Sequence, residues 1–166
     1  MATYQQVLRT IHRSGADYVF IGLSAAGAYG ATAASYDLDF FVRPDPKHLE
    51  CVRRAFRKLG MDDSLSKFDS ATVVAWEATV KCSDAYGGPM VDLLTRISGP
   101  SFDEVWRDSR VRNYSGVRVR VASLKHIVES KRAAGREKDW DDLKRLERDF
   151  GDLLRETRGS YRIKKR

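Results

Sequence analysis

Three aspartates placed inside apolar, strand-like segments constrain this chain more than any other feature. Residues 36–42 (YDLDFFV) and 90–94 (MVDLL) have the composition of buried strands, yet they carry Asp37, Asp39 and Asp92. An ionised carboxylate among apolar neighbours is costly unless it is paired or binds a metal. Because residues two apart on a strand point to the same face, we expect Asp37 and Asp39 to converge. With Asp92 they would form an all-oxygen site for a hard cation such as Mg²⁺; the alternative is a surface strand that exposes them harmlessly.

Length and composition predict one globular domain. The chain has 166 residues, which is long enough to form a hydrophobic core. With 42% hydrophobic and 32% charged residues, its composition is that of a globular protein and not of a disordered chain. We assign residues 1–154 to this domain. No segment approaches the length of a membrane span, the N-terminus lacks the order of a signal peptide, and Cys51 and Cys82 have no metal-site spacing. We therefore expect a cytoplasmic protein without membrane contact.

The positive charge is concentrated at the C-terminus. The net charge is +7, and residues 155–166 contain six basic residues and one acidic residue. We interpret this segment as a basic tail. A solvated terminus explains it, and so does contact with an RNA backbone or a triphosphate.

The apolar patterns and turn residues predict a single α+β domain, a mixed β-sheet flanked by helices. Asp45 and Pro46 indicate the start of one helix, and Ser123 and Gly135 bracket another. We expect helices over residues 3–13, 23–30, 46–59, 101–108, 123–134 and about 137–154, strands over 17–22, 36–42, 71–81 and 90–94, and a hairpin over 111–121.

The segment between the first strand and Asp37 predicts a phosphate site. Gly22 ends the strand and lets a backbone approach a phosphate closely, and Ser24 adds a hydroxyl at the start of the following helix. Metal ions held by the three aspartates could then bridge a triphosphate and an attacking oxygen, while the nearest carboxylate takes the proton of the acceptor. A metal-dependent phosphoryl hydrolase could use the same carboxylates, although the Gly22–Ser24 element disfavours it.

These motifs together resemble the nucleotidyltransferase superfamily of the DNA polymerase β-like fold. The residues that carry the resemblance are IGLSAAGAYGATAASYDLDFFV, then MVDLLTRI, then SLKHIVESKRAAGREKDWDDLKRL. The last segment looks like the small bacterial nucleotidyltransferases of the abortive-infection toxin type. The resemblance covers residues 17–146 and implies a nucleotidyltransferase-like mixed sheet with the C-terminal helices packed on the domain.

The resemblance also implies an activity, a catalytic set and partners. The enzyme would move a nucleotidyl group from an NTP to a hydroxyl acceptor and release pyrophosphate, with Asp37, Asp39 and Asp92 as catalytic and metal-binding residues. The cofactor would be Mg²⁺, with Mn²⁺ as the alternative. The acceptor could be tRNA, a protein or a small molecule such as an antibiotic, and a toxin–antitoxin context implies an antitoxin partner.

The C-terminal helices add two cations to the expected nucleotide site. Leu124, Ile127 and Val128 form an apolar stripe that Lys131 continues. The resemblance implies that Lys131 and Arg136 bind the triphosphate. The alternatives are that Lys131 reaches water, or that Asp139 or Asp142 forms a salt bridge with Lys131 or Arg136.

The chain departs from the family pattern at Leu23 and at Ala33, the latter standing where relatives with an R-x-T before the DxD carry Arg. Leu23 stands where the family has a second Gly or Ser directly after Gly22. The alternative function is therefore a catalytically degenerate module of the same fold that binds nucleotide or RNA without turnover. His12, His48 and His126 share no ligand spacing, so we assign them to core or surface roles.

Tyr29, Trp76 and Trp106 are expected in the core, although Tyr29 could also flank a nucleotide base.

Overall fold

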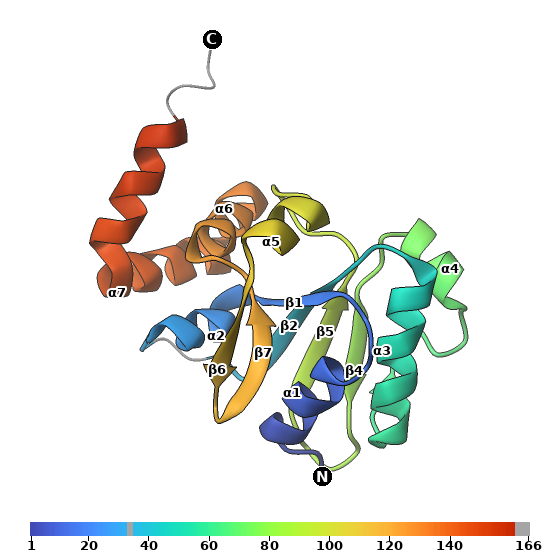
Figure 1. Cartoon of the computed structure of the whole chain (residues 1–166). Coiled ribbons are helices and arrows are strands. Elements are labelled where there is room, and N and C mark those ends of the chain that lie inside the picture. Colours follow the sequence, from blue (N-terminus) through green and yellow to red (C-terminus); the bar gives the residue numbers. More distant parts are fainter. Residues whose placement is uncertain (33–34, 162–166) are drawn as a thin grey trace.

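The structure is a computed structural model that describes residues 1–32 and 35–161, with side chains as far as 152 and that of Leu154. Helices and strands alternate irregularly along the chain (Figure 1). The elements are α1 (Tyr4–His12), β1 (Tyr18–Ile21), α2 (Gly22–Ala26), the 3₁₀ helix η1 (Gly27–Tyr29), β2 (Asp37–Val42), α3 (Pro46–Lys58), β3 (Asp62–Asp63), α4 (Ser70–Ala75), β4 (Val80–Ser83), β5 (Met90–Leu94), α5 (Phe102–Asp108), β6 (Arg110–Tyr114), β7 (Val117–Val121), α6 (Leu124–Ala134) and α7 (Glu137–Tyr161).

The strands described form one mixed sheet in the order β3-β4-β5-β2-β1-β7-β6. β2 runs parallel to β5 and β1 runs parallel to β7, whereas the other neighbours are antiparallel. A mixed sheet flanked by helices confirms the predicted α+β class. The topology places β2, β5 and β1, which carry or adjoin the predicted site, in the middle of the sheet.

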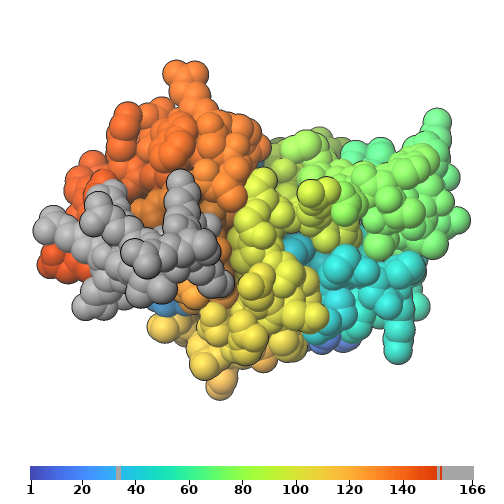
Figure 2. All heavy atoms as spheres, turned by 90° about the horizontal axis from the view of Figure 1, so that it is seen from above, coloured from blue at the N-terminus to red at the C-terminus, as the bar shows by residue number. Residues whose placement is uncertain are grey.

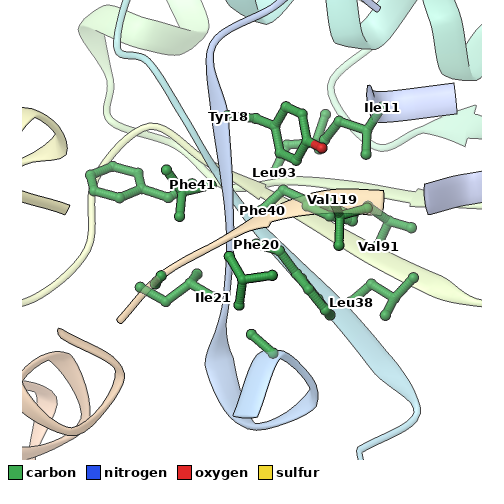
Figure 3. Packing of buried hydrophobic residues seen from close by; sticks show 14 of the residues in the cluster. Ile11, Tyr18, Phe20, Ile21, Leu38, Phe40, Phe41, Val91, Leu93 and Val119 are labelled. Atoms are coloured by element: carbon green, nitrogen blue, oxygen red, sulfur yellow. The ribbon is translucent and has the colours of Figure 1, made fainter. Parts of the chain in front are cut away.

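Side chains of the central strands alternate between the two faces of the sheet. On one face Phe40 lies 5.2 Å from Phe20 and 5.9 Å from Tyr18 between ring centroids (Figure 3). Tyr18 also makes an edge contact with His12 of α1. On the other face Phe41 packs on the first residue of α5, with ring centroids 5.1 Å apart. Both faces are therefore covered, and the apolar residues of the strands form the core.

The predicted caps are present where local chemistry sets them. The Asp45 carboxylate accepts the Lys47 backbone N–H, and Pro46 is the first residue of α3. The Ser123 hydroxyl oxygen accepts a backbone N–H at the start of α6, and Gly135 ends that helix in the left-handed conformation. These contacts fix where α3 and α6 begin and hence how they lie on the sheet.

The prediction of one strand over residues 71–81 was wrong. Its first half is α4, because the Asp69 carboxylate caps Thr72 and Val73 is buried on the inner side of the short helix. Its end belongs to β4, which starts at Val80. Thr and Val favour strands only weakly, and here tertiary packing decides the outcome.

The last helix continues past its expected end. α7 runs to Tyr161 with non-helical dihedral angles at Phe150, so its backbone includes residues 155–161 of the segment interpreted as a tail. Residues 162–166 lie outside the described range. In the part of the chain described, no helix combines the length and apolar character needed to cross a membrane.

Candidate active site

The three aspartates line one cleft. Asp39 pairs in register with Asp92 on the parallel neighbour β5, and Asp37 lies two residues earlier on β2. All three therefore lie on the sheet face that also carries Phe41. The cleft above them has a volume of about 1320 Å³. The sequence thus identified three residues that the fold brings together, and their role as metal ligands stays a prediction.

Segments distant in sequence wall this cleft. Gly22 and Ile21 contribute from the end of β1, residues 95–102 from the loop into α5, and Lys131 and Arg136 from the C-terminal helices. In Figure 2 the segment around α5 (yellow) lies between the C-terminal helices (orange) and the α4 region (green). The cleft is therefore assembled by tertiary structure, with lining residues from α4, α5 and α6. Figure 1 shows these three helices at the same end of the sheet.

Glycine is the only residue type that fits at position 22, beside Asp39. Its φ is +82°, in the left-handed region that side chains disfavour, and a Cβ there would lie 2.3 Å from the Asp39 Oδ2 atom. A glycine is required both by the backbone angle and by the carboxylate. Gly22 thus shapes the pocket in which Asp39 lies, whatever ligand its backbone also meets.

Leu23 and Ser24 turn away from the cleft. Leu23 is 5% exposed and belongs to the hydrophobic core, and Ser24 is 2% exposed. The Ser24 hydroxyl lies 2.8 Å from the Asp37 carbonyl oxygen and 3.1 Å from that of Ser35, to which it donates. Neither Leu23 nor Ser24 is among the described residues that line the cleft. The departure at Leu23 is accommodated as a core contact, and Ser24 holds the start of β2.

The surroundings of Asp39 shift the pKa of its carboxyl group. Burial, reinforced by the negative charges of Asp92 and Asp37, raises its pKa from 3.8 to about 6, while Lys131 opposes the rise. An acidic group that is costly to ionise is typical of a site that receives a cation.

We expect this perturbation to be visible in stability. Because the pKa of Asp39 is about 6 in the fold and 3.8 without it, the native state binds more protons between these values. The free energy of unfolding should therefore fall as pH rises from about 4 to 6 and then level off. Urea denaturation in EDTA at several pH values, with wild type minus Asp39→Asn as the measured difference, isolates this contribution. A difference that does not change with pH would contradict it.

A lysine that the sequence analysis missed contacts the third carboxylate. Lys81 on β4 pairs in register with Asp92, and its Nζ atom lies 3.1 Å from both carboxylate oxygens of Asp92. The Lys81 side chain is 60% exposed. Alternation along β4 could have indicated that Lys81 faces the cleft, but its strand partner could not be known from sequence. The ion pair lowers the net negative charge beneath the cleft.

Lys131 and Arg136 both line the cleft, and both have acidic partners. The Lys131 ammonium lies 2.7 Å from Asp142 and 3.7 Å from Asp139, with the lysine side chain 11% exposed. Arg136 Nε lies 2.7 Å from the Asp139 carboxylate, and its side chain is 76% exposed. The salt bridges considered as an alternative are therefore present. They lie within the cleft wall, where both cations are within reach of a ligand.

Asp37, Asp39 and Asp92 have the donor chemistry that a hard cation prefers, but they do not form a complete coordination site. Within the described residues, no group of three His, Cys, Asp or Glu side chains is arranged to hold a metal ion. However, Asp37, Asp39 and Asp92 supply oxygen donors on one face. The raised pKa of Asp39 reflects its burial first and the negative charges of Asp92 and Asp37 second, and a bound cation would offset both. Asp37 and Asp39 could supply oxygen donors to Mg²⁺, while Asp92 would share its oxygens with Lys81.

The structure corrects the expected position of one aromatic residue. Trp76 was predicted in the core, but it is 57% exposed and lines the cleft. Tyr29 and Trp106 pack partly buried against the core. His12 contacts Tyr18, His48 accepts the Asp17 backbone N–H, and His126 is 3% exposed.

Comparison with known proteins identifies the fold. No protein-family model and no curated protein sequence matches the chain. A solved structure from Thermotoga maritima described as a nucleotidyltransferase is similar with a TM-score of 0.57 and 15% identity, over 87% of this chain and 89% of that one.

Two further solved structures share this architecture. The antibiotic-resistance factor ANT(2'')-Ia has a TM-score of 0.56 and 11% identity, over 95% of this chain and 88% of its own. A Helicobacter pylori protein described as a nucleotidyltransferase has a TM-score of 0.50 and 18% identity, over 87% of this chain and 67% of its own. The chain therefore has the nucleotidyltransferase fold, as the sequence motifs predicted.

Proposed function

We propose that this protein is a nucleotidyltransferase that transfers a nucleotidyl group from an NTP to a hydroxyl acceptor. The observation that carries the proposal is the cleft itself: Asp37, Asp39 and Asp92 line its floor, and Lys131 and Arg136 line its wall, on a fold shared with nucleotidyltransferases. In the reaction the acceptor oxygen forms a bond to the α-phosphorus of the NTP. The bond from that phosphorus to the bridging oxygen breaks, pyrophosphate leaves, and the acceptor proton passes to a carboxylate or water.

Each cleft residue has a role in this proposal. Asp37, Asp39 and Asp92 would hold Mg²⁺ or Mn²⁺, which supplies Lewis-acid stabilisation of the charge on the phosphoryl oxygens. Lys131 and Arg136 would contact the triphosphate, which competes with Asp142 and Asp139 for Lys131 and with Asp139 for Arg136. Gly22 leaves room for Asp39, and Ser24 supports the site by holding the Asp37 carbonyl.

Three kinds of hydroxyl-bearing molecule could serve as the acceptor: tRNA, a protein, or a small molecule such as an antibiotic. tRNA and protein acceptors suit a chain with a basic C-terminal segment, and one protein of similar fold is an antibiotic-resistance factor. A toxin that modifies tRNA or protein would require an antitoxin partner in the cell. Each kind of acceptor is a separate arm of the same assay.

The test is incubation with each α-labelled NTP and Mg²⁺ in the presence of total tRNA, cell-lysate protein or an aminoglycoside. We expect label to enter one acceptor class with stoichiometric release of pyrophosphate. Phosphate release without an adduct would instead support a hydrolase. Nucleotide binding without transfer to any acceptor would support the non-catalytic module, which the salt bridges of Lys131 and Lys81 favour.

Substituting Gly22 should separate site geometry from backbone strain. Gly22→Ala introduces a Cβ that collides with the Asp39 carboxylate, and we expect transfer to fall by about a hundredfold because a ligand carboxylate is displaced. The matched control is Gly60→Ala, since Gly60 has φ +81° and an added methyl group there would meet nothing within 4 Å. Both variants should lose about 1–2 kcal/mol of stability from the left-handed angle, but only the first should lose activity. Equal activities in a steady-state transfer assay would contradict the role assigned to Gly22.

A further inference from the structure

Trp76 is an exposed aromatic residue at one end of the cleft. It directly follows α4, is 57% exposed, and lines the same cleft as the three aspartates. Its ring meets that of Phe68 edge-on, with centroids 4.9 Å apart. Phe68 therefore contacts one side of the Trp76 indole, and more than half of the residue's surface is left to solvent or a ligand.

Two contacts tie down the backbone around Trp76. Its backbone N–H donates to the Thr72 carbonyl at the end of α4 (3.0 Å). The next residue, Glu77, has φ +51°, an uncommon angle for a residue with a side chain, and it forms a salt bridge with Arg96 of the loop after β5. The backbone on both sides of Trp76 is thus tied to α4 and, through Glu77, to the loop that follows β5, while Phe68 contacts one edge of its ring.

The place of Trp76 in the fold is opposite the cationic wall. Trp76 and Arg96 belong to the side of the cleft formed by α4, β4 and the end of β5. Lys131 and Arg136 line the cleft from the α6 and α7 side, and the aspartates lie on β2 and β5 between them. A molecule with phosphate groups near Lys131 and Arg136 and a flat ring against Trp76 would fit this arrangement, in which Arg96 on the Trp76 side is already paired with Glu77.

We propose that Trp76 is a stacking surface for a nucleobase bound in this cleft. The inference rests on the proposed nucleotide chemistry and extends it with a recognition residue. The ring belongs either to the incoming NTP or to the terminal nucleotide of an RNA acceptor. Stacking on an aromatic side chain accepts any base, because every base has a π-face.

Equilibrium binding by calorimetry tests this surface without requiring transfer. The probes are the four NTPs with Mg²⁺, inorganic tripolyphosphate, a single-stranded RNA hexanucleotide and kanamycin. We expect Trp76→Ala to weaken at least one base-bearing probe by about tenfold or more, and Trp76→Phe to retain most of the affinity. Tripolyphosphate, which has no base, should bind equally to all variants. Trp140→Ala is the matched control, since Trp140 is 50% exposed and absent from the described lining of the cleft.

The arms of the experiment have distinct meanings. A loss confined to NTPs assigns the surface to the donor base, and a loss confined to the hexanucleotide assigns it to the acceptor. Unchanged binding of every base-bearing probe by Trp76→Ala, an equal loss for tripolyphosphate, or a loss for kanamycin alone would each overturn the proposal. If the wild-type protein binds a base-bearing probe through Trp76 but transfers no nucleotidyl group to any acceptor, the proposed activity is refuted and the stacking proposal stands.

Discussion

Asp39→Asn should abolish nucleotidyl transfer, lowering the turnover rate by at least about a thousandfold. Asparagine keeps the shape of the side chain but removes the charge that would neutralise a divalent cation. A bound metal supplies several kcal/mol of transition-state stabilisation, and each 1.4 kcal/mol, roughly, is a factor of ten in rate. Asp39 is the central member of the set, since it lies beside Asp92 in register and two residues from Asp37.

The same substitution should leave the fold intact or make it more stable. Burial and the neighbouring carboxylates raise the pKa of Asp39 to about 6, so at neutral pH the fold carries a charge that it disfavours. An amide has no such charge, and we expect an equal or higher urea midpoint for Asp39→Asn at pH 7 in EDTA. Opposite signs for activity and stability are the signature of a group retained for function.

A surface aspartate provides the matched control for this experiment. Asp62 is exposed on β3 and is absent from the described cleft lining, so Asp62→Asn makes the same chemical change away from the site. It should keep full activity in the transfer assay. Activity within tenfold of wild type in Asp39→Asn would rule out Asp39 as an essential ligand, and a lower urea midpoint would show that Asp39 has a structural partner instead.

The aspartate pattern could be predicted because it depends on short-range rules. Alternation along a strand places Asp37 and Asp39 together without knowledge of the fold. The helix starts at Asp45 and Ser123 were likewise set by their own side chains. Asp92 lies beside Asp39 because β2 pairs with β5. The order of the motifs led us to expect this pairing but does not specify it.

The missed features all depend on long-range contacts. Lys81 reaches Asp92 only because β4 pairs with β5, and nothing in the letters around Lys81 specifies that register. Trp76 is exposed because residues 70–75 form a helix where β-branched residues suggested a strand. Leu23 and Ser24 follow Gly22 directly, yet their directions depend on how α2 packs on β2. Local pattern thus located the site, and tertiary structure decided which neighbours complete it.

A buried ion pair holds the segment that leads to α4 and Trp76. The Arg53 side chain is 2% exposed and lies 2.5 Å from the Asp63 carboxylate. It also donates to the Ser70 hydroxyl and to the carbonyls of Leu65 and Phe68. One guanidinium therefore satisfies four acceptors in the connection between β3 and α4.

Arg53→Met should be the most destabilising of these substitutions. It leaves the Asp63 carboxylate buried without its cation, and breaking a buried pair from one side costs about 3–5 kcal/mol. Urea denaturation followed by far-ultraviolet circular dichroism measures the loss. Arg57→Met on the same helix is the control: its side chain is 53% exposed and pairs with Glu50, so the loss should stay below about 1 kcal/mol.

Replacing both members of the pair distinguishes a lost interaction from a stranded charge. Arg53→Met with Asp63→Leu removes the uncompensated carboxylate, and we expect this double variant to recover much of the stability that Arg53→Met loses. The Leu65 and Phe68 carbonyls would still lack their donor, so recovery should be incomplete. If Arg53→Met were as mild as Arg57→Met, water would have to reach the pair in solution. Phe68, whose carbonyl accepts from Arg53, lies in the connection into α4 and contacts the Trp76 ring. A mobile connection would therefore remove the contact that orients Trp76.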